Sequence, residues 1–185
     1  MRWDNPESDI RFYLCGMRSI VEELKVTCLN KLKENQHKIH ESIDRLSEED
    51  LWWRPNAQSN SIGNIVLHLC GNLTQYILSG IGGAEDHRKR SSEFAEQGPI
   101  AKNEILSRLD QTLEKAYEVI HQCDEPSLMT DRQVQVYDVS GVNILIHVTE
   151  HFSYHTGQIA YFTKWRSGKS LNFYDDKKLE GTSHK

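Results

Sequence analysis

The sequence lacks the features of several common protein classes. Its longest apolar run, Ile62 to Cys70, is interrupted by Gly63, Asn64 and His68. A membrane-spanning helix needs roughly 20 consecutive apolar residues. We therefore expect no membrane span.

Cysteine is scarce and scattered. The four cysteines, Cys15, Cys28, Cys70 and Cys123, form no CxxC pair, which argues against a disulfide framework and against a thiolate zinc site. Three acidic residues stand within the first nine positions, where a signal peptide would be basic and then apolar. We expect reduced thiols and a cytoplasmic location.

The chain also lacks an excess of positive charge. Its 22 basic and 27 acidic residues give a formal net charge of −5, so no basic surface is expected to neutralise phosphates and nucleic acid is not an expected partner. A small-molecule substrate fits this composition better. The 185 residues suit a single domain, which we place at 1–172, followed by a polar tail at 173–185.

What the sequence does contain is apolar residues at helical spacing. Steps of three and four residues predict four long helices, over 10–46, 61–79, 102–122 and 141–165. The fold class is therefore all-α.

The connections between these helices are uneven. Ser47, followed by three acids, predicts a short helical turn before Pro55. Residues 84–99 are charged and poor in apolar side chains, which indicates a long surface crossover, and 124–141 predict an extended connection or a short hairpin. Such connections favour an irregular four-helix bundle over an up-down-up-down one.

Three histidines, His147, His151 and His155, recur every four residues in the last predicted helix. Each step turns the side chain by roughly 40°, so all three share one stripe. An HxxxH pair can supply two metal ligands, and His68 in the second helix is the best candidate for a third. The spacing equally fits pH-sensitive packing or an exposed polar face, with His68 as a hydrogen-bonded core residue.

A metal held by three neutral imidazoles would keep an open coordination position, which is the pattern of catalytic sites. Zinc is the simplest choice, and nickel, cobalt, iron and copper also accept imidazole. Cys70 stands two positions after His68 and so points roughly 200° away from it. Any thiol in the chemistry would therefore come from a cofactor.

Two segments resemble the DinB-like, YfiT-like superfamily. They are SIGNIVLHLCGN at 61–72 and EHFSYHTGQIAYF at 150–162, accompanied by a Trp-Arg-Pro element at 53–55. The resemblance covers most of the chain. It implies an up-down-down-up four-helix bundle that binds a divalent metal, typically nickel or zinc, and that is a homodimer. Carried over to this sequence, the ligands are His68, His151 and His155.

The resemblance also implies a chemistry. Members with assigned activities are thiol-dependent S-transferases, including bacillithiol and mycothiol enzymes, and a maleylpyruvate isomerase. We therefore expect an S-transferase that joins a low-molecular-weight thiol to small electrophiles. A metal-dependent hydrolase is one alternative. The other is a non-catalytic, metal-binding dimeric bundle that senses a ligand or stress.

Several neighbours of the histidines are candidates for supporting roles. Glu150 and Gln158 flank the HxxxH pair and are the candidate catalytic residues, with Glu150 as the base in the hydrolase alternative. His147 and Asn72 are expected beside the ligands rather than on the metal. Trp53 is a candidate wall of a substrate pocket, although an aromatic side chain at a helix end more often fills the core.

Overall fold

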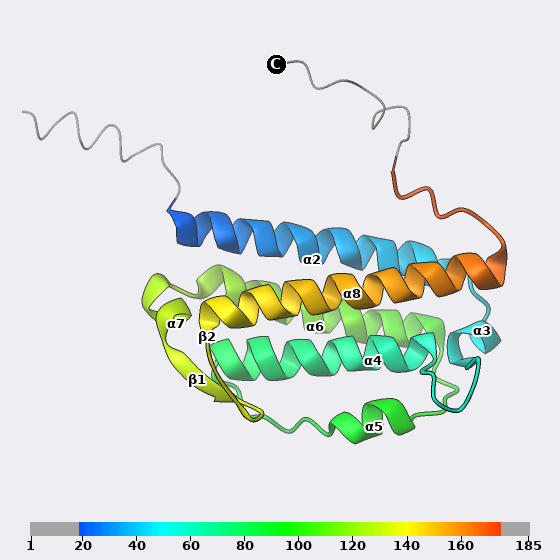
Figure 1. Ribbon diagram of the computed structural model, residues 1–185, viewed down its shortest axis with the longest axis horizontal. Coiled ribbons are helices and arrows are strands. Elements are labelled where there is room, and N and C mark those ends of the chain that lie inside the picture. The colour runs from blue at the N-terminus through cyan, green and yellow to red at the C-terminus, as the bar shows by residue number, and fades with distance from the viewer. Residues whose placement is uncertain (1–18, 175–185) are drawn as a thin grey trace, which may run out of the picture.

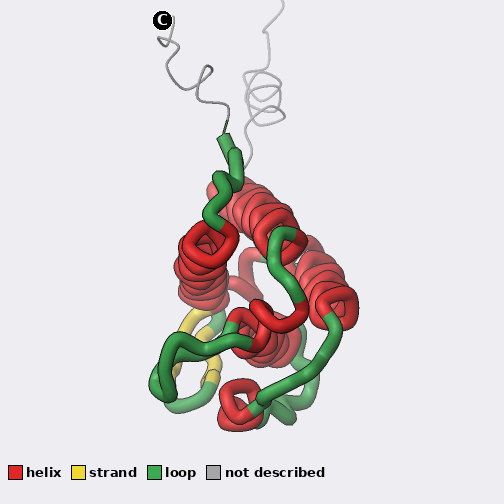
Figure 2. Tube along the Cα trace, turned by 90° about the vertical axis from the view of Figure 1, so that its right-hand side faces the viewer, coloured by secondary structure: helices red, strands yellow, loops and turns green. Residues whose placement is uncertain are grey.

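Four long helices dominate the computed structural model of the chain, which describes residues 19–174 (Figure 1). The long helices are α2 (Ile20–Asp44), α4 (Ile62–Leu73) with its continuation η1 (Thr74–Ile81), α6 (Lys102–Gln122) and α8 (Gly141–Ser167). In Figure 1, α2 and α8 run from left to right, and α4 and α6 run the opposite way. Figure 2 views the helices nearly along their axes and shows them grouped as a bundle. The predicted up-down-down-up arrangement is confirmed.

Serine residues begin three of these helices. The hydroxyls of Ser19, Ser61 and Ser140 each accept a hydrogen bond from a backbone N–H in the first turn, which stabilises a helix start by about 1 kcal/mol. The spacing of apolar residues predicted helix starts at 61 and 141, close to the observed starts at Ile62 and Gly141. Positions 10–18 of the predicted first helix lie outside the described residues.

The second long helix changes from α to π geometry part of the way along. From Thr74 to Ile81 the helix is π-helical, and the N–H of Gly82 donates to the carbonyl of Ile77 at 2.9 Å. The helix ends at Ile81 and is capped by Gly82. The next residue, Gly83, has a φ of 75°, a conformation that glycine adopts without strain. Apolar spacing predicted one uninterrupted helix to residue 79 and gave no sign of this change.

Short elements occupy the connections. They are α3 (Glu48–Trp52), α5 (Arg90–Ala95), α7 (Glu125–Met129), β1 (Asp131–Val134) and β2 (Tyr137–Ser140). α3 is the predicted helical turn, and β1 and β2 form the antiparallel hairpin that was one of the two expectations for 124–141. α5 and α7 were not predicted. α5 lies outside the four long helices, against α4 (Figure 1).

The core lies where the apolar sides of the four long helices meet. Phe152 of α8, Leu32 of α2, Leu69 of α4 and Leu109 of α6 are fully buried there. α8 packs most extensively on α2 and also contacts α4, so the last helix brings its inner side against the second. Within residues 19–174, no helix combines the length and the apolar composition that crossing a bilayer requires.

The end of the described chain folds back onto α2. Leu171 is buried, and the hydroxyl of Tyr174 accepts a hydrogen bond from the Lys38 ammonium at 2.8 Å. Tyr174 belongs to the predicted tail, whose residues 175–185 lie outside the described part. The boundary between domain and tail stays a prediction.

Candidate metal centre

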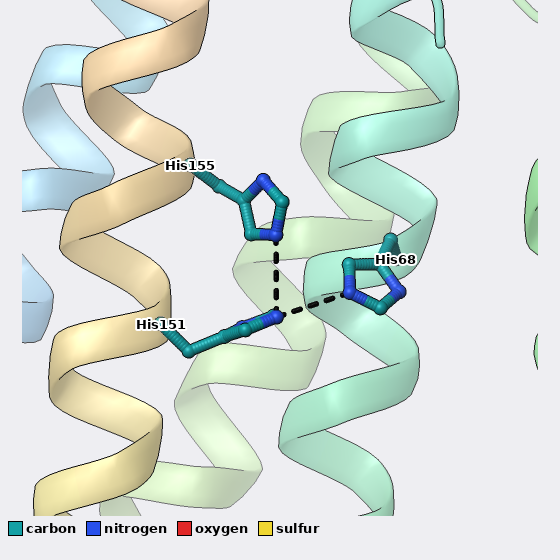
Figure 3. Close-up of side chains that lie close together, drawn as sticks. All are labelled: His68, His151 and His155. Atoms are coloured by element: carbon teal, nitrogen blue, oxygen red, sulfur yellow. Dashed lines mark hydrogen bonds between the residues drawn. The ribbon is translucent and has the colours of Figure 1, made fainter. Parts of the chain in front are cut away.

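The imidazoles of His68, His151 and His155 converge between α4 and α8 (Figure 3). The Nε2 atom of His151 lies 3.0 Å from Nε2 of His68 and 3.2 Å from Nε2 of His155. One nitrogen from each ring lies within 4.8 Å of the other two. The structure thus brings together the three histidines that the sequence singled out.

Two different elements supply these side chains. His151 and His155 are one helical turn apart on α8, so their side chains point in similar directions. His68 lies on α4, which packs against α8. The contact between the two helices, which sequence spacing does not encode, completes the group.

A carboxylate behind His68 fixes the orientation of its ring. Glu93 of α5 accepts a hydrogen bond from Nδ1 of His68 at 2.9 Å. Its carboxylate also accepts from Arg88, at 2.7 Å from Nε and 2.9 Å from Nη2. Burial raises the pKa of Glu93, but the hydrogen bonds from Arg88 and His68 outweigh it and hold this pKa below its ordinary value. The ionised carboxylate can only accept, so Nδ1 of His68 carries the hydrogen of this bond, and in the neutral ring the lone pair is on Nε2.

A glycine makes room for this ion pair. A Cβ atom on Gly71 of α4 would overlap Oε1 of Glu93 and would lie 2.9 Å from Nε of Arg88. The side chains of Glu93 and Arg88 are 10% and 3% exposed, so a larger residue at position 71 would have to displace a largely buried ion pair. Gly71 therefore allows the crossover to approach α4 closely enough for Glu93 to reach His68.

The rings of His155 and His151 differ in what their Nδ1 atoms contact. Nδ1 of His155 donates to Oε1 of Gln158 at 2.7 Å, which leaves the lone pair of His155 on Nε2. Nδ1 of His151 is buried without a hydrogen-bond partner. If Nε2 of His151 carried a proton, it could donate a hydrogen bond to Nε2 of His68 or to Nε2 of His155, but not to both. A cation among the three Nε2 atoms would satisfy all of them, so the donor set fits a divalent metal.

The rings of His151 and His155 favour the neutral form that a metal ligand requires. Burial, together with the neighbouring rings of His155, His68 and His147, lowers the pKa of His151 to about 3. Burial also lowers the pKa of His155. At neutral pH these imidazoles therefore keep their lone pairs, and metal need not displace a proton from them.

His147 lies against the ring of His151, and Asn72 lies against His147. The ring of His147 stacks on that of His151, with centroids 5.5 Å apart, and on Tyr76 at 4.5 Å. The side-chain nitrogen of Asn72 lies 3.4 Å from Nε2 of His147. His147 is not part of the converging group.

The three histidines line an open cavity of about 760 Å³. Apolar and aromatic side chains form much of its wall, among them Ile62, Ile65, Phe94 and Phe162. Gln158 also lines it, whereas Glu150 is exposed and is not among the lining residues. A small molecule can therefore reach the histidines. Of the two candidate catalytic residues of α8, the amide of Gln158 lines the cavity and the carboxylate of Glu150 does not.

The other two candidates from the sequence, Cys70 and Trp53, lie outside the histidine group. Burial raises the pKa of the Cys70 thiol to about 12, and this thiol is not part of the histidine group. Trp53 packs on Phe162 and Trp165, with ring centroids 5.6 and 5.3 Å away. It therefore contacts Phe162, a residue of the cavity wall, without lining the cavity itself. The residues that sequence reasoning missed are Glu93, Arg88 and Gly71, described above. The one sequence feature that could have indicated Arg88 and Glu93 is the charged segment at 84–94.

A second network holds the crossover in place. Oδ1 of Asn64 accepts from the hydroxyl of Ser61 and from Arg54, at 2.7 and 2.8 Å. Its Nδ2 donates to the backbone carbonyls of Glu93 and Glu96, at 2.9 and 2.8 Å. Arg54 donates to the Glu96 carbonyl as well, at 2.9 Å. The start of α4 and the Trp-Arg-Pro element thus anchor the segment that carries Glu93.

Replacing Asn64 with alanine is expected to lower the free energy of unfolding by about 3 kcal/mol, because it removes a helix cap and leaves buried carbonyls without donors. Asn143 is a matched control, since it occupies the same position after Ser140 but is exposed. Asn143→Ala should cost less than about 1 kcal/mol. Urea unfolding of both variants measures the difference. Equal losses would contradict the anchoring role.

Comparison with solved structures supports the fold. A conserved protein from Enterococcus faecalis superposes with a TM-score of 0.67 and 15% identity, covering 78% of this chain and 97% of that one. A DinB-like protein, YjoA, from Bacillus subtilis gives a TM-score of 0.61 and 17% identity, covering 80% of this chain and 98% of that one. These similarities confirm the predicted DinB-like fold.

Comparison with curated proteins gives no match. Residues 20–173 match the family described as "Protein of unknown function (DUF1572)". This match spans the four long helices and all three histidines. The chain belongs to the DUF1572 family.

Proposed function

We propose that His68, His151 and His155 hold one divalent transition metal, zinc or nickel, and that the protein transfers a low-molecular-weight thiol to a small electrophile. One observation carries the proposal: three Nε2 atoms converge at the wall of an open cavity. Bound there, a divalent ion with three neutral ligands would supply an open position and lower the pKa of an incoming thiol or water.

The side chains around the cavity support a role in binding and orientation. Ile62, Ile65 and Phe162 offer an apolar wall against which the carbon skeleton of an electrophile can pack. Gln158 holds His155 through Nδ1, and Glu93 holds His68. Both contacts fix ring orientation and raise the basicity of the ligand nitrogen.

No cysteine within residues 19–174 is placed to act as the nucleophile, so the proposal takes an external thiol. No cysteine is among the described residues that line the cavity, and the high pKa of Cys70 keeps it protonated. In the transfer, the thiol loses its proton to solvent and its sulfur forms a bond to the electrophilic carbon. The leaving group departs from that carbon with its electron pair.

Protein loaded with zinc or nickel is expected to conjugate at least one small thiol to a fluorogenic alkyl halide at about 100 times the rate of the His151→Ala variant. The rate is measured by fluorescence across a panel of thiols. His37→Ala is the control, because His37 is an exposed histidine of α2. A loaded protein no faster than His151→Ala with every thiol would refute the transfer.

The same assay separates the other two candidate functions. Turnover of an ester without any thiol would indicate a hydrolase, although the exposed position of Glu150 gives no support for its role as the base. Metal binding without any turnover would indicate the non-catalytic bundle. In that case metal should still raise the melting temperature, because it binds only the native state.

A further inference from the structure

Arg90 is the one formally charged side chain among the described residues that line the cavity. The other lining residues are apolar, aromatic, amide or hydroxyl side chains and the three histidines. The cavity thus has one positive group in its wall and no carboxylate to balance it.

The charge of Arg90 has no acidic partner within residues 19–174. Arg88, Arg108 and Arg166 are paired with Glu93, Glu104 and Asp50, whereas Arg54 and Arg132 donate to backbone carbonyls. Arg90 is also the first residue of α5, where a cation is repelled rather than stabilised by the helix dipole. Neither ion pairing nor helix stability explains an arginine at this position.

An aromatic ring connects Arg90 to the histidines. The guanidinium carbon of Arg90 lies 4.9 Å from the ring centroid of Phe94, and the same ring packs on His68 with centroids 4.8 Å apart. Arg90 and the His68 ring are therefore no more than about 10 Å apart. Stacking on Phe94 restricts the guanidinium while its N–H groups remain free to donate.

We infer that one of the two reactants carries a carboxylate and that Arg90 binds it, while the reacting end of the molecule lies at the histidines. A guanidinium matches a carboxylate with two parallel hydrogen bonds. The short separation from His68 suits a small reactant, in which a few carbon atoms separate the carboxylate from the reacting atom. This inference rests on the proposed function for the identity of the reactants, and the carboxylate is either on the thiol or on the electrophile.

Two matched probe pairs distinguish these sources. The thiol pair is 3-mercaptopropionate and 3-mercaptopropionamide, titrated into cobalt-loaded protein, where sulfur coordination gives a charge-transfer absorption band. The thiol-free pair is butyrate and butyramide, titrated by calorimetry into loaded and metal-free protein. The variants are Arg90→Gln and, as a control for the lost charge, Lys89→Gln. Lys89 adjoins Arg90 but lines a different hollow.

We expect the carboxylate of at least one pair to bind about tenfold more tightly than its amide to the natural chain and to Lys89→Gln. In Arg90→Gln this ratio should fall to about one, with metal content and amide affinity unchanged. A preference confined to the thiol pair assigns the carboxylate to the thiol, and one in the thiol-free pair assigns it to the electrophile.

No preference in either pair, or a preference that survives Arg90→Gln, would overturn the inference. Failure of the proposed function gives a different result. If the histidines bind no metal, a preference for butyrate over butyramide that Arg90→Gln removes would still support the inference, because that pair requires neither metal nor sulfur.

Discussion

Replacing His151 with alanine is expected to abolish stoichiometric metal binding. His151 is the central ring of the group, since its Nε2 lies 3.0 and 3.2 Å from those of His68 and His155. Without it the remaining two imidazoles come from different helices and offer only two ligands, fewer than a stable zinc site uses. The affinity should fall by about 100-fold or more.

Elemental analysis of protein purified without chelator measures this effect. The natural chain and the His37→Ala control should carry about one metal per chain, and His151→Ala less than about a tenth of that. Added metal should raise the melting temperature of the control but not that of His151→Ala. Equal metal content in the three proteins would place the metal elsewhere, and a metal-free natural chain would remove the basis of the proposed chemistry.

Replacing Glu93 with glutamine is expected to weaken metal binding by about 10- to 100-fold although no ligand is removed. An amide oxygen can still accept from His68, but it carries no charge to polarise the ring. The change also leaves Arg88, whose side chain is 3% exposed, as a buried cation without its partner. That costs about 3 to 5 kcal/mol of stability.

A double variant separates the two effects. Combining Glu93→Gln with Arg88→Met removes the unpaired cation, so urea unfolding should show most of the stability restored. Competition with a chromogenic chelator should still show the weakened metal affinity, because His68 still lacks its carboxylate. Recovery of both stability and affinity in the double variant would mean that Glu93 acts only through the fold.

Much of the fold follows from local patterns. The spacing of apolar residues predicted α6 at its observed bounds and the starts of α4 and α8 to within one residue. The four-residue repeat predicted that His151 and His155 share a side of α8. These features depend on residues within one or two helical turns, which a sequence displays directly.

What the sequence did not predict depends on contacts across the chain. The Glu93 carboxylate reaches His68 across 25 positions, from a segment with too few apolar residues to predict a helix there. The π geometry of η1 arises from backbone hydrogen bonding that apolar spacing does not record. The placement of Glu150 outside the cavity depends on how α8 is rotated in the bundle. Homodimer formation and a cytoplasmic location stay predictions.

Gly71 restricts the order in which mutations could have built this site. Because any larger side chain there would overlap the Glu93 carboxylate, an acid at position 93 is useful only in a lineage that already has glycine at 71. The reverse order would pass through an intermediate with a displaced crossover. In relatives, positions 71 and 93 should therefore vary together, and a chain with a bulky residue at 71 must orient the equivalent of His68 by another group.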